Sequence, residues 1–176
     1  MKNFKTLFFG LLFTGIIFSG CNKIEEATEV TFEAKFEADL NVVVPPASRN
    51  VSFETEDTID PVSDPEVEKY IDKIKKFEVQ TLIAEVTSIS KNVTLVVADL
   101  SVFNTNPTAV WHMENLPLTL GATIPLGNED GQWNTVNQIF DEKTPFTVKL
   151  VGETDEGDVT FTVKVTFVTK VTAKTL

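Results

Sequence analysis

Hydrophobic and polar residues alternate along two long segments near opposite ends of the chain. Every second residue is apolar from Val30 to Val44, and the same alternation returns between Val159 and Val171. A period of two predicts a β-strand with one buried face and one solvated face. Two such strands so far apart in sequence predict an antiparallel sheet that is closed by pairing between its ends.

Shorter apolar segments between them predict the remaining strands. The phase of the apolar positions changes between Val79 and Leu82, which predicts a β-bulge near Thr81. The segment Leu95–Ala98 is apolar on both faces and predicts a central strand, and Gly157 predicts the last hairpin turn. The predicted intermediate strands are Val51–Thr55, Phe77–Ile89, Val93–Phe103, Thr108–Glu114, Leu118–Ile124 and Pro145–Glu153.

Two helical inserts interrupt this pattern. The segment Ser63–Glu66 combines a capping residue with a proline near the first helical position, and predicts a helix that ends near Lys76. A second helix is predicted from Gln132 to Phe140. Seven to eight strands with these inserts predict an all-β fold, an antiparallel β-sandwich of immunoglobulin-like layout. The chain lacks the Cys-Trp-Cys signature of a true immunoglobulin domain.

The N-terminus has the pattern of an export signal. Lys2 and Lys5 precede an apolar run from Leu7 to Phe18, which is shorter than the roughly 20 residues that a spanning helix needs. The segment Phe18-Ser19-Gly20-Cys21 then resembles the lipobox of bacterial lipoproteins. Two alternatives are a buried free cysteine and an apolar N-terminal helix that is retained as an anchor.

The lipobox resemblance implies that Cys21 becomes the mature N-terminus and carries the acyl chains that bind the membrane. Residues 1–20 are then a signal peptide, residues 21–28 a lipidated tether, and residues 29–176 a single β-sandwich domain. In the enteric lipoproteins that this segment resembles, an Asp directly after the cysteine signals retention in the inner membrane. Asn22 at that position therefore implies the outer membrane.

Two further features bear on the compartment. Lys23 with Glu25–Glu26 resembles a surface-export signal interrupted by Ile24, so the protein is expected to face the periplasm or the cell surface. The order of alternating strand, acidic turn at Asp60–Glu66 and helix ending in Ile74-Lys75-Lys76 resembles uncharacterised β-sandwich lipoproteins of the Bacteroidetes type. That resemblance covers the first half of the mature chain and implies a compartment without an activity.

The charge of the chain excludes several partners. Its 15 basic and 26 acidic residues give a formal net charge of -11. Removing residues 1–20 takes away two lysines and no acidic residue, so 13 basic against 26 acidic residues leave a net charge of -13. Nucleic acid is therefore not expected as a partner, and the acyl chains rather than the protein surface must hold the protein to the membrane.

No catalytic motif is found in the sequence. The chain has one cysteine and one histidine, and Cys21 is consumed by acylation in the lipoprotein interpretation. Strand alternation places His112 on the face opposite Trp111, where a solvated histidine is expected. We therefore expect no enzymatic activity and no cofactor.

The sequence contains candidates for a calcium site, a sugar-stacking site and an O-glycosylation site. Asp57, Asp60 and Asp64 provide clustered oxygen atoms of the kind that calcium prefers, but they lack the EF-hand spacing, as do the two acidic loops near Glu129 and Asp155. No metal site is therefore assigned.

An exposed indole of Trp111 or Trp133 could stack on a sugar ring, whereas core tryptophans would not. Asp57-Thr58-Ile59 resembles the O-glycosylation motif of secreted Bacteroidetes-type proteins, with Thr58 as the acceptor. The sequence predicts a non-catalytic structural or ligand-binding lipoprotein whose partner is an envelope protein or a glycan. The alternative is a carbohydrate-binding accessory lipoprotein of a polysaccharide-uptake system.

Overall fold

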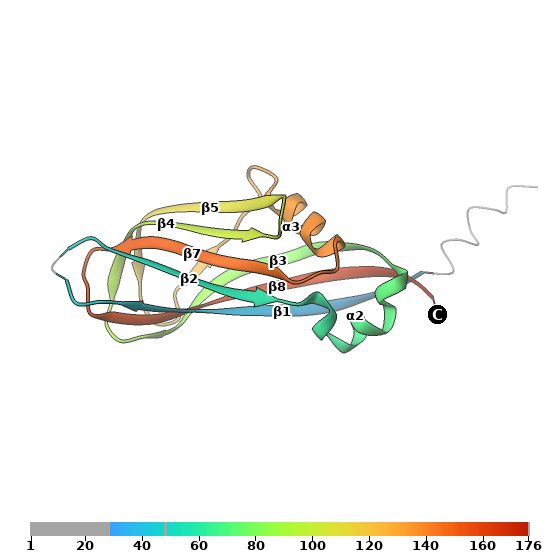
Figure 1. Cartoon of the computed structure of the whole chain (residues 1–176), viewed down its shortest axis with the longest axis horizontal. Coiled ribbons are helices and arrows are strands. Elements are labelled where there is room, and N and C mark those ends of the chain that lie inside the picture. The colour runs from blue at the N-terminus through green and yellow to red at the C-terminus, as the bar shows by residue number, and fades with distance from the viewer. Residues whose placement is uncertain (1–28, 48, 176) are drawn as a thin grey trace, which may run out of the picture.

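The computed structural model describes residues 29–47 and 49–175. Within these residues the chain forms eight strands and two short α-helices, arranged as two packed sheets (Figure 1). The predicted signal peptide and Cys21 lie outside the described residues. The elements are β1 (Glu29–Val44), β2 (Val51–Ile59), the 3-10 turn η1 (Pro61–Ser63), α2 (Pro65–Tyr70), η2 (Ile71–Lys73), β3 (Ile74–Ile89), β4 (Val93–Phe103), β5 (Thr108–Leu118), β6 (Thr123–Pro125), α3 (Gln132–Asp141), β7 (Phe146–Thr154) and β8 (Val159–Lys174).

The two amphipathic strands at opposite ends of the domain pair with each other. β1 and β8 run antiparallel without a break in register, from Glu29 opposite Lys174 to Val44 opposite Val159. Alternate side chains of β1 are buried from Ala34 onward, as the period of two requires. The predicted pairing between the ends of the domain is confirmed.

The two sheets have the strand orders β1-β8-β3-β6 and β2-β7-β4-β5. Every described strand pair is antiparallel, so the predicted β-sandwich of seven to eight strands with short helical inserts is confirmed. The strand order differs from the immunoglobulin layout, in which the first two strands lie side by side in one sheet. Here β1 and β2 belong to opposite sheets, and the connectivity is that of a jelly roll.

Because of this connectivity, most turns join strands of opposite sheets rather than neighbours in one sheet. Among the described strands, only β4 and β5 are both consecutive in sequence and paired in one sheet. The turn at Gly157 joins β7 to β8, which lie in opposite sheets, so the predicted hairpin is wrong although the turn itself is present. The predicted central position of β4 is correct, because β4 lies between β7 and β5.

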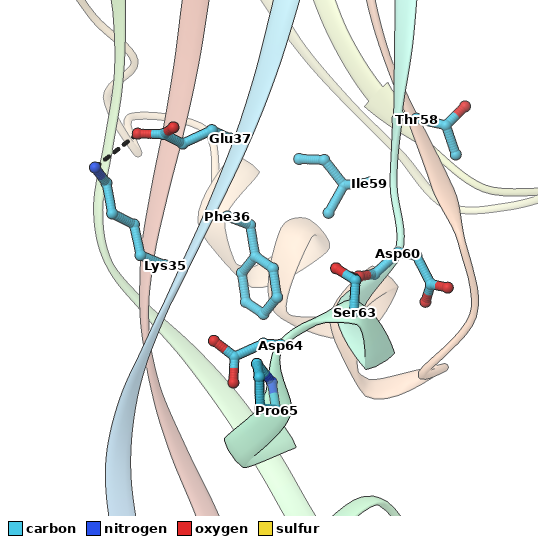
Figure 2. Close-up of a pocket in the computed structure, with 9 residues that line it drawn as sticks. All are labelled: Lys35, Phe36, Glu37, Thr58, Ile59, Asp60, Ser63, Asp64 and Pro65. Atoms are coloured by element: carbon cyan, nitrogen blue, oxygen red, sulfur yellow. Dashed lines mark hydrogen bonds and ion pairs between the residues drawn. The ribbon is translucent and has the colours of Figure 1, made fainter. Parts of the chain in front are cut away.

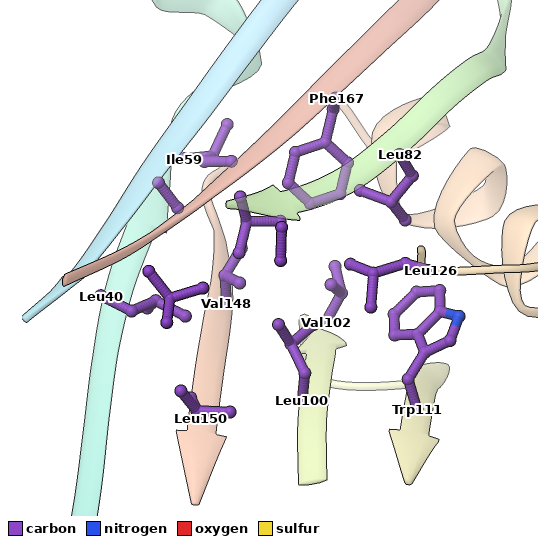
Figure 3. Close-up of a cluster of buried hydrophobic side chains, with 14 of the residues drawn as sticks. Leu40, Ile59, Leu82, Leu100, Val102, Trp111, Leu126, Val148, Leu150 and Phe167 are labelled. Atoms are coloured by element: carbon purple, nitrogen blue, oxygen red, sulfur yellow. The ribbon is translucent and has the colours of Figure 1, made fainter. Parts of the chain in front are cut away.

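The core lies between the inner faces of the two sheets. Figure 3 shows side chains from both sheets meeting there, including Leu40 and Phe167 from one sheet and Leu100 and Leu150 from the other. α3 closes one end of this core with Phe140, which is fully buried. Its ring centroid lies 4.8–5.8 Å from four other phenylalanine rings, namely Phe36, Phe77, Phe146 and Phe167.

The first helical insert is shorter than predicted. The Asp64 carboxylate accepts hydrogen bonds from the N–H groups of Glu66 and Val67, so the predicted cap is confirmed. The helix ends at Tyr70, whereas the sequence predicted it to continue to Lys76. Ile74 instead begins β3 opposite Ala173 of β8, and in this strand its side chain is buried.

Other boundaries differ by a few residues. The register of β3 shifts between Val79 and Thr81, which confirms the predicted bulge. β2 continues to Ile59, and β5 continues to Leu118. The strand predicted over Leu118–Ile124 is therefore wrong in its first part, since Leu118 belongs to β5 and only the end of the segment enters β6.

Candidate functional site

A pocket of about 310 Å³ lies between the outer strands β1 and β2, beside the start of α2 (Figure 2). Phe36 and Ile59 supply its apolar surface, and both side chains are almost fully buried. Asp60 and Asp64 supply acidic groups at its edge. The pocket thus brings together two of the three aspartates that were considered as calcium ligands.

Those three aspartates do not converge on a common point. Asp60 accepts a hydrogen bond from the Val62 N–H at 3.0 Å, and Asp64 caps the first turn of α2. Asp57 is bonded to two other backbone N–H groups. Across residues 29–47 and 49–175, no group of three or more His, Cys, Asp or Glu side chains is arranged to hold a metal ion. The carboxylates instead accept hydrogen bonds from backbone N–H groups, at the starts of η1 and α2 for Asp60 and Asp64 and on strands β1 and β2 for Asp57.

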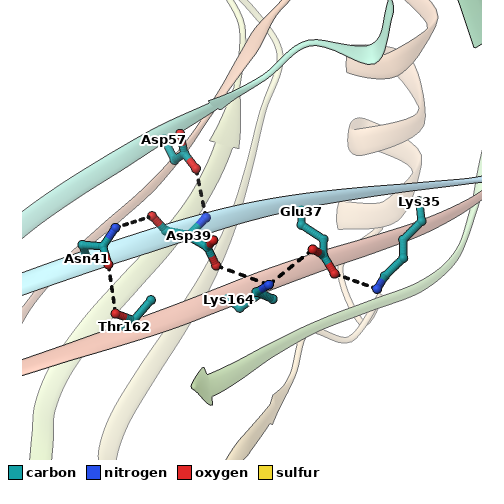
Figure 4. A network of polar contacts seen from close by, with 7 residues as sticks. All are labelled: Lys35, Glu37, Asp39, Asn41, Asp57, Thr162 and Lys164. Carbon is teal, nitrogen blue, oxygen red and sulfur yellow. Dashed lines mark hydrogen bonds and ion pairs between the residues drawn. The ribbon is translucent and has the colours of Figure 1, made fainter. Parts of the chain in front are cut away.

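Asp57 connects the outer strands of the two sheets (Figure 4). Its Oδ2 atom accepts a hydrogen bond from the Asp39 N–H of β1 at 2.9 Å, and its Oδ1 atom accepts one from the Thr58 N–H at 2.8 Å. Both N–H groups belong to strands that have a paired neighbour on one side only. No pattern in the sequence predicts this contact, because β1 and β2 meet only through the packing of the two sheets.

A row of charged side chains crosses the outer face of the β1–β8 pair beside Asp57 (Figure 4). The Glu37 carboxylate lies 2.6 Å from Lys35 Nζ and 3.3 Å from Lys164 Nζ, and these two hydrogen bonds hold the pKa of Glu37 below its usual value. Lys164 also lies 3.7 Å from Asp39. Each of these side chains is partly or largely solvated, and the row supports the register of the β1–β8 pair.

Thr58 lies on β2, and its side chain is exposed. Thr58 lines one side of the pocket, and in Figure 2 its side chain is directed away from Phe36, as alternation along a strand requires. Its hydroxyl is therefore on the outer surface of the sandwich, where a modifying enzyme has access. The backbone around Thr58 is a regular strand rather than a loop.

The two tryptophans belong mainly to the core. Trp111 is 6% exposed, and its Nε1–H donates to the Gly127 carbonyl at 2.8 Å. Trp133 is half-buried against the core, and its Nε1–H donates to the Leu126 carbonyl at 2.8 Å. Trp111 offers no free ring face to a sugar, so the stacking platform considered from the sequence is not formed there.

His112 lies on the face of β5 opposite Trp111, as the sequence predicted. Its Nδ1 atom is 2.7 Å from an Asp99 carboxylate oxygen, and its Nε2 atom is 3.1 Å from a Glu114 carboxylate oxygen. These two hydrogen bonds, first that with Asp99 and then that with Glu114, raise the pKa of His112. Both ring nitrogens are engaged by carboxylates, so neither is free to accept a proton from a serine or threonine hydroxyl.

Sequence spacing could have identified one of these two partners. Glu114 is two residues from His112 on the same strand and must share its face. Asp99 is on β4 and becomes a neighbour only through the register that places it opposite His112.

The loops farthest from Glu29 and Lys174 are tied to one another. The Gly157 N–H donates to the Ala47 carbonyl at 3.2 Å, and the Asp158 N–H donates to the Pro45 carbonyl at 3.1 Å. A pocket of about 470 Å³ lies beside these loops, and Val43, at its edge, is 74% exposed. Backbone hydrogen bonds therefore brace this end of the sandwich, and the Val43 side chain there is exposed to solvent.

Comparison with known proteins gave no relative: no protein-family model matches the chain, and no curated protein matches it. None of the described helices is both long enough and apolar enough to cross a membrane. Over the part of the chain that the structure describes, the fold defines the class, an eight-stranded jelly-roll sandwich with two short α-helices.

Proposed function

We propose that this protein is a lipid-anchored, non-catalytic module of the bacterial cell envelope. The lipobox-like segment ending at Cys21 supports the anchor. In this proposal the acyl chains on Cys21 bind the membrane of the envelope, most simply the outer membrane. The sandwich then serves as a structural or ligand-binding unit for an envelope protein or a glycan.

One structural relationship supports the proposal best. β1 begins at Glu29, eight residues after Cys21, and Glu29 pairs with Lys174 at the same end of the sandwich. In Figure 1 the start of β1 lies beside the C-terminus, and the β1–β2 and β7–β8 loops lie at the opposite end. With 16 residues, β1 spans about 50 Å. An anchor at Cys21 would thus attach one end and present the other end away from the lipid.

The geometry around His112 supports the absence of catalysis. The histidine is exposed, and both of its ring nitrogens contact carboxylates rather than a nucleophile. The burial of Trp111 removes one of the two indoles that would have favoured the carbohydrate-binding alternative. We therefore propose the non-catalytic module without a sugar-stacking role for that indole.

The anchor is tested by replacing the cysteine in the full chain. We expect the native protein to sediment with membranes and to be released by detergent, with a lipid mass on the Cys21 peptide. C21S should lose that mass and leave the membrane fraction, whereas the control N22A should behave as the native protein does. Membrane retention of C21S without a lipid mass would contradict the proposal and indicate a retained apolar anchor.

The orientation of the module is tested separately by digesting intact cells with protease. Cleavage of the sandwich in intact cells would support a location on the cell surface. Protection in intact cells with cleavage after the outer membrane is opened would support a location facing the periplasm. Cleavage only after the cytoplasmic membrane is opened would contradict both envelope locations.

We also propose Thr58 as an acceptor for O-glycosylation. Its exposed hydroxyl on an outer strand supports this, together with the preceding Asp57 and the following Ile59. Intact-mass measurement of protein from its native host should show a glycan mass that T58V lacks. The control T55V, on the same strand, should retain that mass. An unmodified native mass would contradict this modification.

A further inference from the structure

Three titratable side chains form a row across the outer face of the β4–β5 pair. Asp99 of β4 lies directly opposite His112 of β5, and Glu114 follows on the same face of β5. Nδ1 of His112 is 2.7 Å from the Asp99 carboxylate, and Nε2 is 3.1 Å from the Glu114 carboxylate. The imidazole therefore connects a carboxylate on each of the two strands.

β5 is the outer strand of its sheet and pairs with β4 alone. Side-chain contacts across the β4–β5 pair consequently have more effect on local opening of β5 than they would on a central strand. The contact between His112 and Asp99 is such a cross-strand link. On the opposite face of β5, Trp111 is anchored in the core by its bond to Gly127.

The charged groups nearest the His112 imidazole are the two carboxylates that contact it. β4 contributes Asp99, and β5 contributes Glu114. β7 carries Lys149 and Glu153 on the same face, one strand farther away. In α3, which packs against β5, the one charged residue is Asp141, and this carboxylate is bonded to the Phe77 N–H of β3.

His112 is the only histidine of the chain. No other side-chain type has an ordinary pKa between pH 5 and 8. We propose that Asp99, His112 and Glu114 form a pH-sensitive latch that holds the outer strand β5 on β4 when the imidazole is protonated. Loss of the proton leaves the two carboxylates without their shared cation and loosens β5.

The direction of the pH effect follows from the two carboxylates. Because they raise the pKa of His112 in the folded chain, the folded state holds this proton more tightly than the unfolded state does. The latch is complete below the ordinary histidine pKa of about 6.5 and is lost as the pH rises through the higher folded value. Since the row is solvated, its strength also decreases at high salt.

Hydrogen exchange of the full chain tests the proposal at pH 6.0 and pH 8.5, with rates corrected for the intrinsic effect of pH. We expect β5 amides of the native protein to lose about two- to fivefold of their protection at the higher pH, the range that exposed ion pairs support. H112Q should show no such change in β5. The β1–β8 pair serves as the internal reference, and its protection should be the same at both pH values.

A second measurement follows the imidazole directly. In NMR titrations D99N should lower the pKa of His112, while S101A, at the next outward-facing position of β4, should leave it unchanged. Equal pH dependence of β5 exchange in the native protein and H112Q would overturn the latch. An unchanged β5 exchange in the native protein between the two pH values would overturn it as well.

Discussion

The Asn137 side chain accepts a hydrogen bond from the backbone N–H of Val79 at 2.7 Å, which fixes α3 against the edge of β3. Asp141 makes the same contact with the Phe77 N–H at 2.8 Å. Four helical residues rise about 6 Å and two strand residues about 6.7 Å, so the two side chains match the spacing of the outward-facing N–H groups. α3 thus covers the part of β3 that β6 does not reach, because β6 pairs only with Ile83–Glu85.

Replacing Asn137 by alanine tests whether this contact between α3 and β3 stabilises the fold. The Val79 N–H would lose its acceptor at a site where the Val79 side chain is buried. We expect N137A to reduce the free energy of unfolding by about 1–3 kcal/mol, as measured by urea denaturation. The control N134A removes an exposed side chain of the same helix and should change stability by less than about 0.5 kcal/mol. Equal stability of the two variants would contradict the role of Asn137.

Asp141 should show a dependence on pH that its amide variant lacks. Loss of hydration raises the pKa of Asp141, and the Phe77 N–H, Lys143 and Lys76 only partly oppose this rise. The folded state therefore binds this proton more tightly, and stability from this group is lost as pH rises through the folded pKa.

D141N keeps an oxygen acceptor for Phe77 and removes the charge. We expect D141N to be at least as stable as the native protein at pH 7, and this advantage to disappear below about pH 3.8. D141A should be less stable at both pH values because it has no acceptor. Denaturation curves at the two pH values measure these differences. A D141N variant that is clearly less stable than the native protein at pH 7 would contradict the conclusion that the charge of the partly buried Asp141 costs stability.

We expect Asp57 to stabilise the contact between β1 and β2 more than its exposed neighbour Glu56 does. D57A removes both hydrogen-bond acceptors, those of the Asp39 and Thr58 N–H groups. We expect a loss of about 1 kcal/mol in unfolding free energy and faster amide exchange at Asp39. E56A serves as the control, since Glu56 is exposed. If the Asp39 amide exchanged at the same rate in D57A and E56A, the contact would not hold the two sheets together.

Gly157 should not tolerate a side chain. A Cβ atom there would lie 2.4 Å from the Pro45 carbonyl oxygen and 2.4 Å from the Ala47 nitrogen, both backbone atoms. We expect G157A to lower the free energy of unfolding by about 1–3 kcal/mol, because the two loops must separate. E156A, at the exposed neighbouring position, should cost less than about 0.5 kcal/mol. A G157A protein with native stability would show that these loops are not closely braced.

The sequence predicted the elements with a strong local period best. β1 and β8 alternate over many residues, and α3 repeats its apolar positions at helical spacing, so each pattern has one structural interpretation. The insert from Pro65 to Lys76 was ambiguous, because Ile74 continues the helical stripe and also fits the buried face of β3. Pairing with β8 decided in favour of the strand.

Of the candidate site residues, the sequence correctly placed His112 on the face opposite Trp111. It could not determine whether the indoles were exposed, since this depends on where the fold places the Leu126–Gly127 segment, whose carbonyl groups accept hydrogen bonds from both indoles. Nor could it predict the contacts of Asp57 with Asp39 or of Asp99 with His112, each of which joins two different strands.

The sequence by itself determined that the chain forms an antiparallel β-sandwich with short helices. The reason is that alternation of apolar and polar residues along a strand specifies which of its faces is buried. The tertiary structure alone decided the jelly-roll order, the cover of β3 by α3 and the latch on β5. These depend on which strands meet and in what register. Such pairings join residues that are far apart in sequence, such as Glu29 and Lys174, and no local period specifies them.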